Sequence, residues 1–241
     1  MSNQWQETML AEVKAGGRIS DQHIVDMIRQ AVLSQRLPPG TRLPEVALGE
    51  IFGVSRSVVR KALTRLASYH VITQQPNQVA RVCAPDIDET HEIFAARRLV
   101  EGEVVALLAG KLEPEQCAVL AGHMEAEKAA YAEGDETARI EHSLAIHHYL
   151  ADHSPNRILG KMLSELILRT SIVIALYKQP SLASCYLEGD HDTLLARLRD
   201  GDAEGARRAI DNHLASLERL LDLRAQENRI DLAAIFGKLG G

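Results

Sequence analysis

Three histidines in the second half of the chain are spaced so that their imidazole rings could meet. His191 and His213 stand about eleven residues on either side of a Gly201-Asp202 turn. With a rise of about 1.5 Å per residue, both lie roughly 16 Å from that turn and are level with each other on antiparallel helices. His147 lies near the middle of another predicted helix, so its ring can reach a similar height.

Convergence of these rings would create a metal site. Imidazole is a common ligand of Zn²⁺ and related ions, and helix bundles place such ligands in their cores. A single buried histidine is more often a hydrogen-bonded polar side chain than a ligand, so both interpretations stay open. A three-histidine ion with an open position is also an arrangement used by hydrolytic enzymes. No residue is clearly nominated as the general base that such an enzyme would need.

A second chemically suggestive group is basic and lies near the N-terminus. Residues 1–84 hold ten Lys and Arg against six Asp and Glu, a net charge of +4, whereas the other residues hold 17 against 27, a net charge of −10. A basic segment joined to an acidic body indicates that one part meets a polyanion and the other does something else.

The basic residues gather on one face of a predicted helix over residues 55–69. At about 100° per residue, an apolar stripe lies opposite a face of hydroxyls and cations. The stripe is Val59, Ala62, Leu63 and Leu66, and the polar face is Ser57, Lys61 and Thr64, flanked by Arg60 and Arg65. Helices that read the DNA major groove need this division, because arginine can bond guanine and small hydroxyls can bond phosphates. The alternative is an ordinary amphipathic helix with a solvated basic face.

The residues just before this helix favour the DNA-reading interpretation. Gly49 permits a close approach, Gly53 suits a tight turn, and Ser55 is placed to cap the following helix. A short helix over residues 45–52 precedes the turn, and a longer one begins after Ser20 and ends before Pro38. Two short strands over residues 71–73 and 79–82 then form a hairpin.

The rest of the chain carries only helical patterns. Six helices are predicted, over residues 88–110, 114–133, 136–152, 155–178, 181–199 and 202–224. Their short connections indicate an antiparallel bundle, so the fold is mainly α. The expected organisation is a lead-in over residues 1–17, an N-terminal domain over 18–84, an all-helical domain over 85–228 and a tail over 229–241.

Composition excludes several classes of protein. The 241 residues include no apolar run of the ~18 residues that a membrane span requires, and the first residues lack the pattern of a secretory signal. The three cysteines are far apart in the sequence, which argues against a disulfide framework. We therefore expect a cytoplasmic protein with no membrane partner.

The N-terminal motifs resemble a known family. The runs Leu37-Pro38-Pro39-Gly40-Thr41-Arg42-Leu43 and Gly53-Val54-Ser55-Arg56-Ser57-Val58-Val59-Arg60 are similar to the winged helix-turn-helix of GntR-type bacterial transcription regulators. That resemblance covers residues 20–82 and implies that Arg42, Arg56 and Arg60 contact operator DNA. Asn77 and Gln78, in the hairpin that would be the wing, are placed to reach phosphates or A·T base edges. The candidate DNA contacts are Arg42, Ser55, Arg56, Ser57, Arg60, Lys61, Thr64, Arg65, Asn77 and Gln78.

The helical part resembles the FCD-type effector domain of the FadR subfamily, in its six-helix VanR-like branch. The motifs that carry this resemblance are Arg97…Glu101, His147-His148-Tyr149, Ser154-Pro155-Asn156, Gly189-Asp190-His191 and His213-Leu214. The resemblance implies a divalent ion, with Zn²⁺ expected, held by His147, His191 and His213. Where metal-binding members have an aspartate one turn before the first histidine, this chain has Ser143.

The same resemblance implies a site for a small carboxylate effector formed by Arg97, Ser143 and Asn156. Arg97 could instead form a surface salt bridge with Glu101, four residues further on. Either an ion persists with water or the effector in its open position, or the histidines bind the acid without metal. The expected function is a ligand-responsive DNA-binding repressor acting as a homodimer on double-stranded operator DNA. The alternatives are the hydrolase and a regulator whose ion is purely structural.

Overall fold

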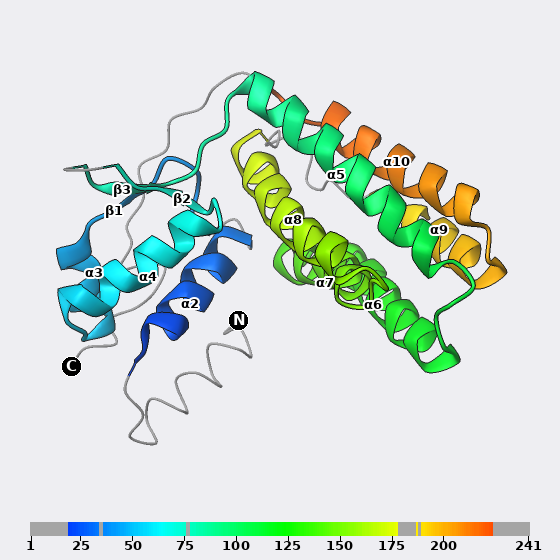
Figure 1. Ribbon diagram of the computed structural model, residues 1–241, viewed down its shortest axis with the longest axis horizontal. Coiled ribbons are helices and arrows are strands. Elements are labelled where there is room, and N and C mark those ends of the chain that lie inside the picture. The colour runs from blue at the N-terminus through cyan, green and yellow to red at the C-terminus, as the bar shows by residue number, and fades with distance from the viewer. Residues whose placement is uncertain (1–18, 34–35, 76–77, 178–186, 188, 224–241) are drawn as a thin grey trace. The chain divides into compact units, whose positions relative to one another are not determined.

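The computed structural model describes residues 19–33, 36–75, 78–177, 187 and 189–223, which divide near residue 84 into two compact units. The unit before that point holds three helices and a small sheet, and the later unit is all helical (Figure 1). The prediction of a mainly α protein with an N-terminal winged helix-turn-helix and a C-terminal helical bundle is confirmed. No helix among these residues is long and apolar enough to cross a membrane.

The N-terminal unit follows the predicted order, with one strand added. Its elements are α2 (Asp21–Leu33), β1 (Arg42–Leu43), α3 (Glu45–Phe52), α4 (Arg56–Ser68), β2 (Ile72–Thr73) and β3 (Ala80–Val82). The sheet has the order β1-β3-β2, and both pairings are antiparallel. Strand β1 was not predicted, because two residues show no periodicity and only their pairing with β3 makes them a strand.

The turn between α3 and α4 depends on two glycines. Gly53 ends α3 in the left-handed conformation, at φ 65°. A Cβ atom on Gly49 would lie 3.1 Å from the carbonyl oxygen of Val54, so a larger residue would push the turn away. The buried residues of α4 are the four predicted ones, Val59, Ala62, Leu63 and Leu66. Packing of this stripe leaves the opposite face of α4 to solvent.

The described residues of the second unit form a bundle of six helices. They are α5 (Ile87–Leu108), α6 (Pro114–Glu133), α7 (Glu136–Asp152), α8 (Arg157–Tyr177), α9 (Asp190–Asp200) and α10 (Ala203–Arg219). Helix α5 packs against α10 and α8, while α6 packs against α7 and α9. The core between them is apolar and includes Phe94, Val104, Leu120, Ile146 and Leu214.

Several helix ends differ from the predicted ends, and three of the differences arise from local structure. Helix α8 begins at Arg157 rather than residue 155, because the side-chain oxygen of Asn156 accepts hydrogen bonds from the N–H groups of Ile158 and Leu159. Helix α9 begins at Asp190, after Gly189 in the left-handed conformation, and most of the predicted start lies outside the described residues. Helix α10 ends at Arg219, five residues before the predicted end. The N–H of Asp222 donates to the carbonyl of Tyr177 rather than to a carbonyl of α10.

Gly160 lets α8 approach α7. A Cβ atom at this position would lie 2.3 Å from the carbonyl oxygen of Ala151, far inside van der Waals contact. We predict that Gly160→Ala lowers the free energy of unfolding by about 1–3 kcal/mol, because two helix backbones must separate. Chemical denaturation followed by circular dichroism measures the change.

Gly122→Ala is the matched control. Gly122 lies inside α6 and is exposed, and a Cβ atom added there would meet no heavy atom within 4 Å. Alanine there should stabilise the helix by about 0.5–1 kcal/mol. Similar stabilisation by both substitutions would contradict the close approach at Gly160.

Candidate nucleic-acid interface and three-histidine site

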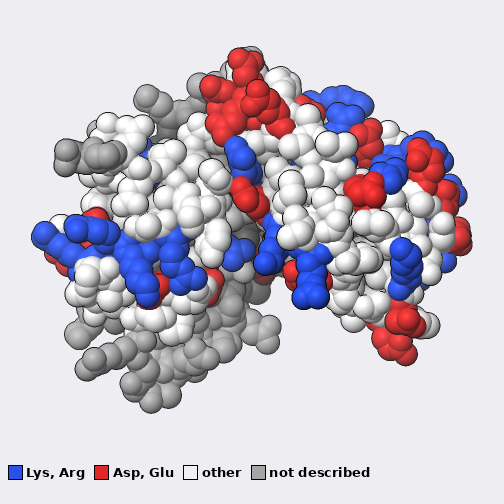
Figure 2. Space-filling model, in the orientation of Figure 1, with Lys and Arg blue, Asp and Glu red and all other residues white. Residues whose placement is uncertain are grey.

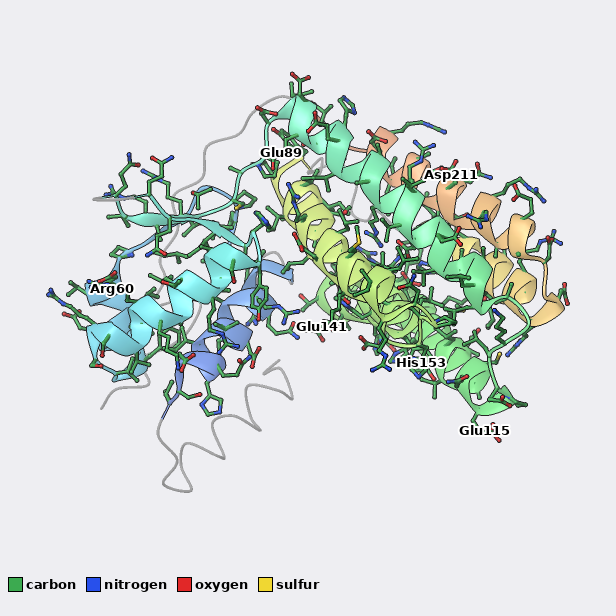
Figure 3. All side chains as sticks on the ribbon, viewed as in Figure 1. Arg60, Glu89, Glu115, Glu141, His153 and Asp211 are labelled. Atoms are coloured by element: carbon green, nitrogen blue, oxygen red, sulfur yellow. The ribbon has the colours of Figure 1, made fainter. Side chains whose placement is uncertain are left out.

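The polar face of α4 is a continuous exposed surface. Arg56, Ser57, Arg60, Lys61 and Thr64 are exposed, and Arg65 is half-buried. Figure 2 shows the Lys and Arg side chains gathered over this helix, and Figure 3 shows Arg60 at its outer surface. Cations on a protruding helix form the surface that a phosphate backbone and a major groove require.

Carboxylates from α2 and α3 hold three of these cations. Arg60 donates from Nε and Nη2 to the two oxygens of Glu45, at 3.0 and 2.8 Å. Lys61 and Arg65 both donate to Asp21, at 3.0 and 2.9 Å. These hydrogen bonds lower the pKa values of Glu45 and Asp21, so both groups stay ionised.

The hydroxyl groups of this surface make local contacts. Ser55 occupies the N-cap position of α4, but its side chain does not cap the helix, contrary to the prediction. Its Oγ atom lies 2.8 Å from Oγ of Ser57 instead. The hydroxyl of Thr64 donates to the carbonyl of Arg60 at 2.9 Å. Each of these oxygens keeps acceptor capacity for a further donor.

The sheet adds a cation that was not among the predicted DNA contacts. Arg42 of β1 and Arg81 of β3 are paired across the strands, and both are exposed. Arg81 also donates to the carbonyl of Gly40 at 3.1 Å. The two arginines are far apart in the sequence, and only the pairing of β1 with β3 shows that they are neighbours. Gln78 is exposed, whereas Asn77 lies outside the described residues.

The three predicted histidines come together inside the second unit. His147 of α7, His191 of α9 and His213 of α10 are all buried. Their ring centroids are 4.7 to 5.4 Å apart, and one ligand nitrogen from each lies within 4.8 Å of the others. Three imidazoles in this arrangement can supply three ligands to one divalent ion.

A carboxylate orients each of the three rings. Glu101 of α5 lies 2.5 Å from Nδ1 of His147, and Glu127 of α6 lies 2.7 Å from Nδ1 of His191. Asp190 lies 3.3 Å from Nδ1 of His213. Because a carboxylate only accepts, Nδ1 carries the proton in each pair and Nε2 keeps its lone pair. Metal-binding histidines are typically oriented in this way.

The ionisation states fit that geometry. Burial lowers the pKa of His147 to about 4 and lowers the pKa of His213 well below its usual value. Burial alone would raise the pKa of Glu101, but the charge of Arg97 and the hydrogen bonds from Arg97 and His147 bring it below its usual range. Neutral imidazoles beside ionised carboxylates are the forms that a metal ion requires. The Nε2 atom of His191 is buried without any hydrogen-bond partner, so it is free to act as a ligand.

Arg97 lies beside this cluster and not on the surface. It donates from Nε to Glu101 at 2.8 Å, but Arg97 is only 2% exposed and Glu101 is fully buried. The alternative of a surface salt bridge with Glu101 is therefore wrong, because the two side chains form a buried ion pair. The Nη2 atom of Arg97 has no partner although it is buried. An unpaired buried donor of this kind is costly unless an anion binds it.

The other candidate residues are less clearly placed. Ser143 is half-buried and lies one helical turn before His147, on the same side of α7. Asn156 is exposed and uses its side-chain oxygen to begin α8.

Three acids of the cluster were not predicted from the sequence. Glu101, Glu127 and Asp190 are the hydrogen-bond partners of the histidines. The spacing of Arg97 and Glu101 suggested only their own pairing, and no pattern marked Glu127. These partners lie far apart in the chain, so only the packed bundle reveals most of them.

Both units match known protein families. Residues 20–82 match the bacterial regulatory proteins of the gntR family, and residues 92–216 match the FCD domain. The chain is 25% identical over 215 residues to the HTH-type transcriptional regulator LutR of Bacillus subtilis, covering 80% of this chain and 96% of LutR. It is 32% identical over 116 residues to an HTH-type transcriptional regulator in the TAR-I ttuE-ttuC' intergenic region of Agrobacterium vitis, covering 42% of this chain and 67% of that protein.

Solved structures give the same match in three dimensions. McbR/YncC of E. coli aligns with a TM-score of 0.71 and 25% identity, over 81% of this chain and 93% of that one. A GntR-type putative transcriptional regulator from Rhodococcus sp. RHA1 aligns with a TM-score of 0.69 and 20% identity, over 83% and 95% of the two chains.

Proposed function

Because this chain belongs to the GntR family of bacterial regulatory proteins, in the FadR subfamily that carries an FCD domain, we propose that it represses transcription until an organic acid binds its helical unit. It is a DNA-binding transcription regulator and not an enzyme, which removes the hydrolase alternative. The observation that carries the proposed sensing role is the cluster of His147, His191 and His213 beside the unpartnered Nη2 of Arg97.

The winged helix-turn-helix supplies the DNA contact. The exposed face of α4 enters the major groove, where Arg56 and Arg60 reach base edges while Lys61 and Arg65 lie near phosphates. Arg42 and Arg81 of the sheet, together with Gln78, lie along the adjacent backbone or minor groove. One short helix offers few base contacts, so selective binding requires two copies on a two-fold symmetric operator.

A second copy of the chain has a suitable surface to pair with. Leu99 of α5 is 78% exposed, and Ile158 and Met162 of α8 are 67% and 46% exposed. Glu89 of α5 pairs with Arg169 of α8, and the two helices run in opposite directions (Figure 1). Leu99 lies ten residues after Glu89, and Ile158 and Met162 lie eleven and seven residues before Arg169. Because the two helices are antiparallel, the three apolar side chains lie at about the same height along them. We assign this apolar patch to the homodimer interface.

In the proposed site, the three histidines would hold a divalent ion through their Nε2 atoms, and Zn²⁺ suits an all-imidazole set. The ion would supply a positive charge to an acidic ligand. Ser143 offers no carboxylate, so the protein would leave room for water or the effector beside the ion.

The effector of the proposed site is a small carboxylic acid. Its carboxylate binds the Nη2 side of Arg97, which has no partner among the described residues. Arg97 and Glu101 both lie on α5, the helix that directly follows the DNA-binding unit in the chain. Occupation of the site therefore acts on α5 and shifts the population of states that fit the operator.

Arg60 tests the proposed DNA contact of α4. Arg60→Ala should weaken binding to the operator by about 1–3 kcal/mol, because a base contact in the major groove is lost. A mobility-shift titration at fixed salt measures the change. Arg208→Ala is the control, since Arg208 is exposed on α10 and pairs with Glu204 of the same helix. Equal affinities for all three proteins would contradict the role of Arg60.

Glu127 and His191 test the proposed metal site. Glu127→Gln should weaken Zn²⁺ binding about 10–100-fold, because Nδ1 of His191 would then donate to a neutral amide oxygen, which raises the basicity of the ring less than a carboxylate does. His191→Ala should weaken binding further by removing a ligand. Competition with a chromogenic chelator gives both affinities. His153→Ala, whose ring stacks on Tyr149 outside the cluster, should bind Zn²⁺ as the native chain does.

Arg97 tests the proposed effector site. In the Zn²⁺-loaded protein, at least one acid from a panel of mono-, di- and tricarboxylates should raise the melting temperature and weaken operator binding. Arg97→Lys keeps a cation beside Glu101 but loses the planar donor pair, so it should reduce the response to that acid at least tenfold. A protein that unfolds when the ion is chelated, yet responds to no acid, would instead have a purely structural ion.

A further inference from the structure

Arg60 differs from the other cations of α4 in how it is held. Its guanidinium bonds both oxygens of Glu45, a residue of the preceding helix, at 3.0 and 2.8 Å. The Arg60 side chain is nevertheless 66% exposed, whereas the Glu45 side chain is only 28% exposed. Arg65, by contrast, is 35% exposed and is held by Asp21 and Gln22. Arg60 is therefore fixed at its inner edge and open at its outer one.

A count of the donors shows which edge is open. A guanidinium has five N–H groups, one on Nε and two on each terminal nitrogen. Glu45 takes the N–H of Nε and one N–H of Nη2, which form one side of the group. The other side keeps the N–H groups of Nη1 and the second N–H of Nη2. Two such parallel donors match the O6 and N7 acceptors of guanine in the major groove.

Glu45 is well placed to stay ionised in this pair. It is the first residue of α3, where the helix dipole favours a negative charge, and the hydrogen bonds from Arg60 lower its pKa. A carboxylate close to DNA also repels the phosphates, so its presence in the binding surface weakens binding to DNA of any sequence. A gain in base recognition would offset that repulsion, because an arginine fixed before binding loses less side-chain entropy.

We propose that Glu45 is a positioning residue that holds Arg60 for bidentate recognition of a guanine in the operator. The proposal rests on the DNA-binding role of α4 given above. It assigns base recognition to Arg60, while Lys61 and Arg65, which Asp21 holds against α2, contribute charge to phosphate binding.

The test compares specific with non-specific binding. The native chain first selects duplexes from a random-sequence pool, and affinities are then measured for the selected duplex and for random duplex. Glu45→Gln should lower the ratio of the two affinities about 5- to 20-fold, because the amide offers one acceptor oxygen in place of two. Its affinity for random duplex should stay equal or rise, because a negative charge is lost. The ratio is insensitive to partial unfolding, since both duplexes report on the same active fraction.

Two controls separate positioning from charge. Glu50→Gln removes the same charge from an exposed site on the same helix and should leave the ratio unchanged. In an Arg60→Ala background, Glu45→Gln should also leave the ratio unchanged, because nothing remains to be positioned. If Glu45→Gln raises both affinities equally, as a simple loss of repulsion would, the positioning role is overturned. If the native chain selects no sequence at all, the proposed DNA-binding function itself fails.

Discussion

The buried carboxylate–imidazole hydrogen bonds decide what the helical unit can bind. Without Glu101, Glu127 and Asp190, three neutral rings in an apolar core could adopt either tautomer and turn their lone pairs in any direction. With these acids on Nδ1, the three Nε2 atoms are the groups left to act on a ligand. The acids come from α5, α6 and α9, so the orientation of the three rings depends on how these helices pack against one another.

Helix α5 links this cluster to the rest of the protein. Its inner side carries Arg97 and Glu101, and Arg98 pairs with Asp211 of α10. Its outer side carries Leu99, within the patch assigned to the dimer. A ligand that binds Arg97 therefore acts on a helix that also belongs to the proposed subunit interface and follows the DNA-binding unit in the chain. Because the proposed ligand site and the proposed interface share one helix, a movement of α5 would couple them without a separate chain of contacts through the core.

The sequence predicted those features that depend on periodicity and missed those that depend on tertiary pairing. The apolar stripe of α4 and the ends of α6 and α7 follow from helical spacing and turn residues, and both agree with the structure. The meeting of His191 and His213 follows from equal distances to one turn. Spacing alone did not predict the burial of Arg97, because its spacing to Glu101 is the same in a surface pair, and only the family resemblance implied a place for Arg97 in the effector site. Nor was β1, which exists only through its partner strand.

The charges around the cluster give a physical reason for the proposed ion and the proposed acid to bind together. Glu101, Glu127 and Asp190 bring three negative charges to the rings, and Arg97 returns one positive charge, so the surroundings carry a net charge of −2. A divalent ion balances that charge. In its absence, an incoming carboxylate would meet a net negative site, and with the ion present it meets a neutral one with Nη2 of Arg97 free. Because coupling between two ligands is reciprocal, an acid that requires the ion must also tighten the hold on the ion. With Ser143 in place of a carboxylate, the proposed effector would supply the negative group that the protein itself omits.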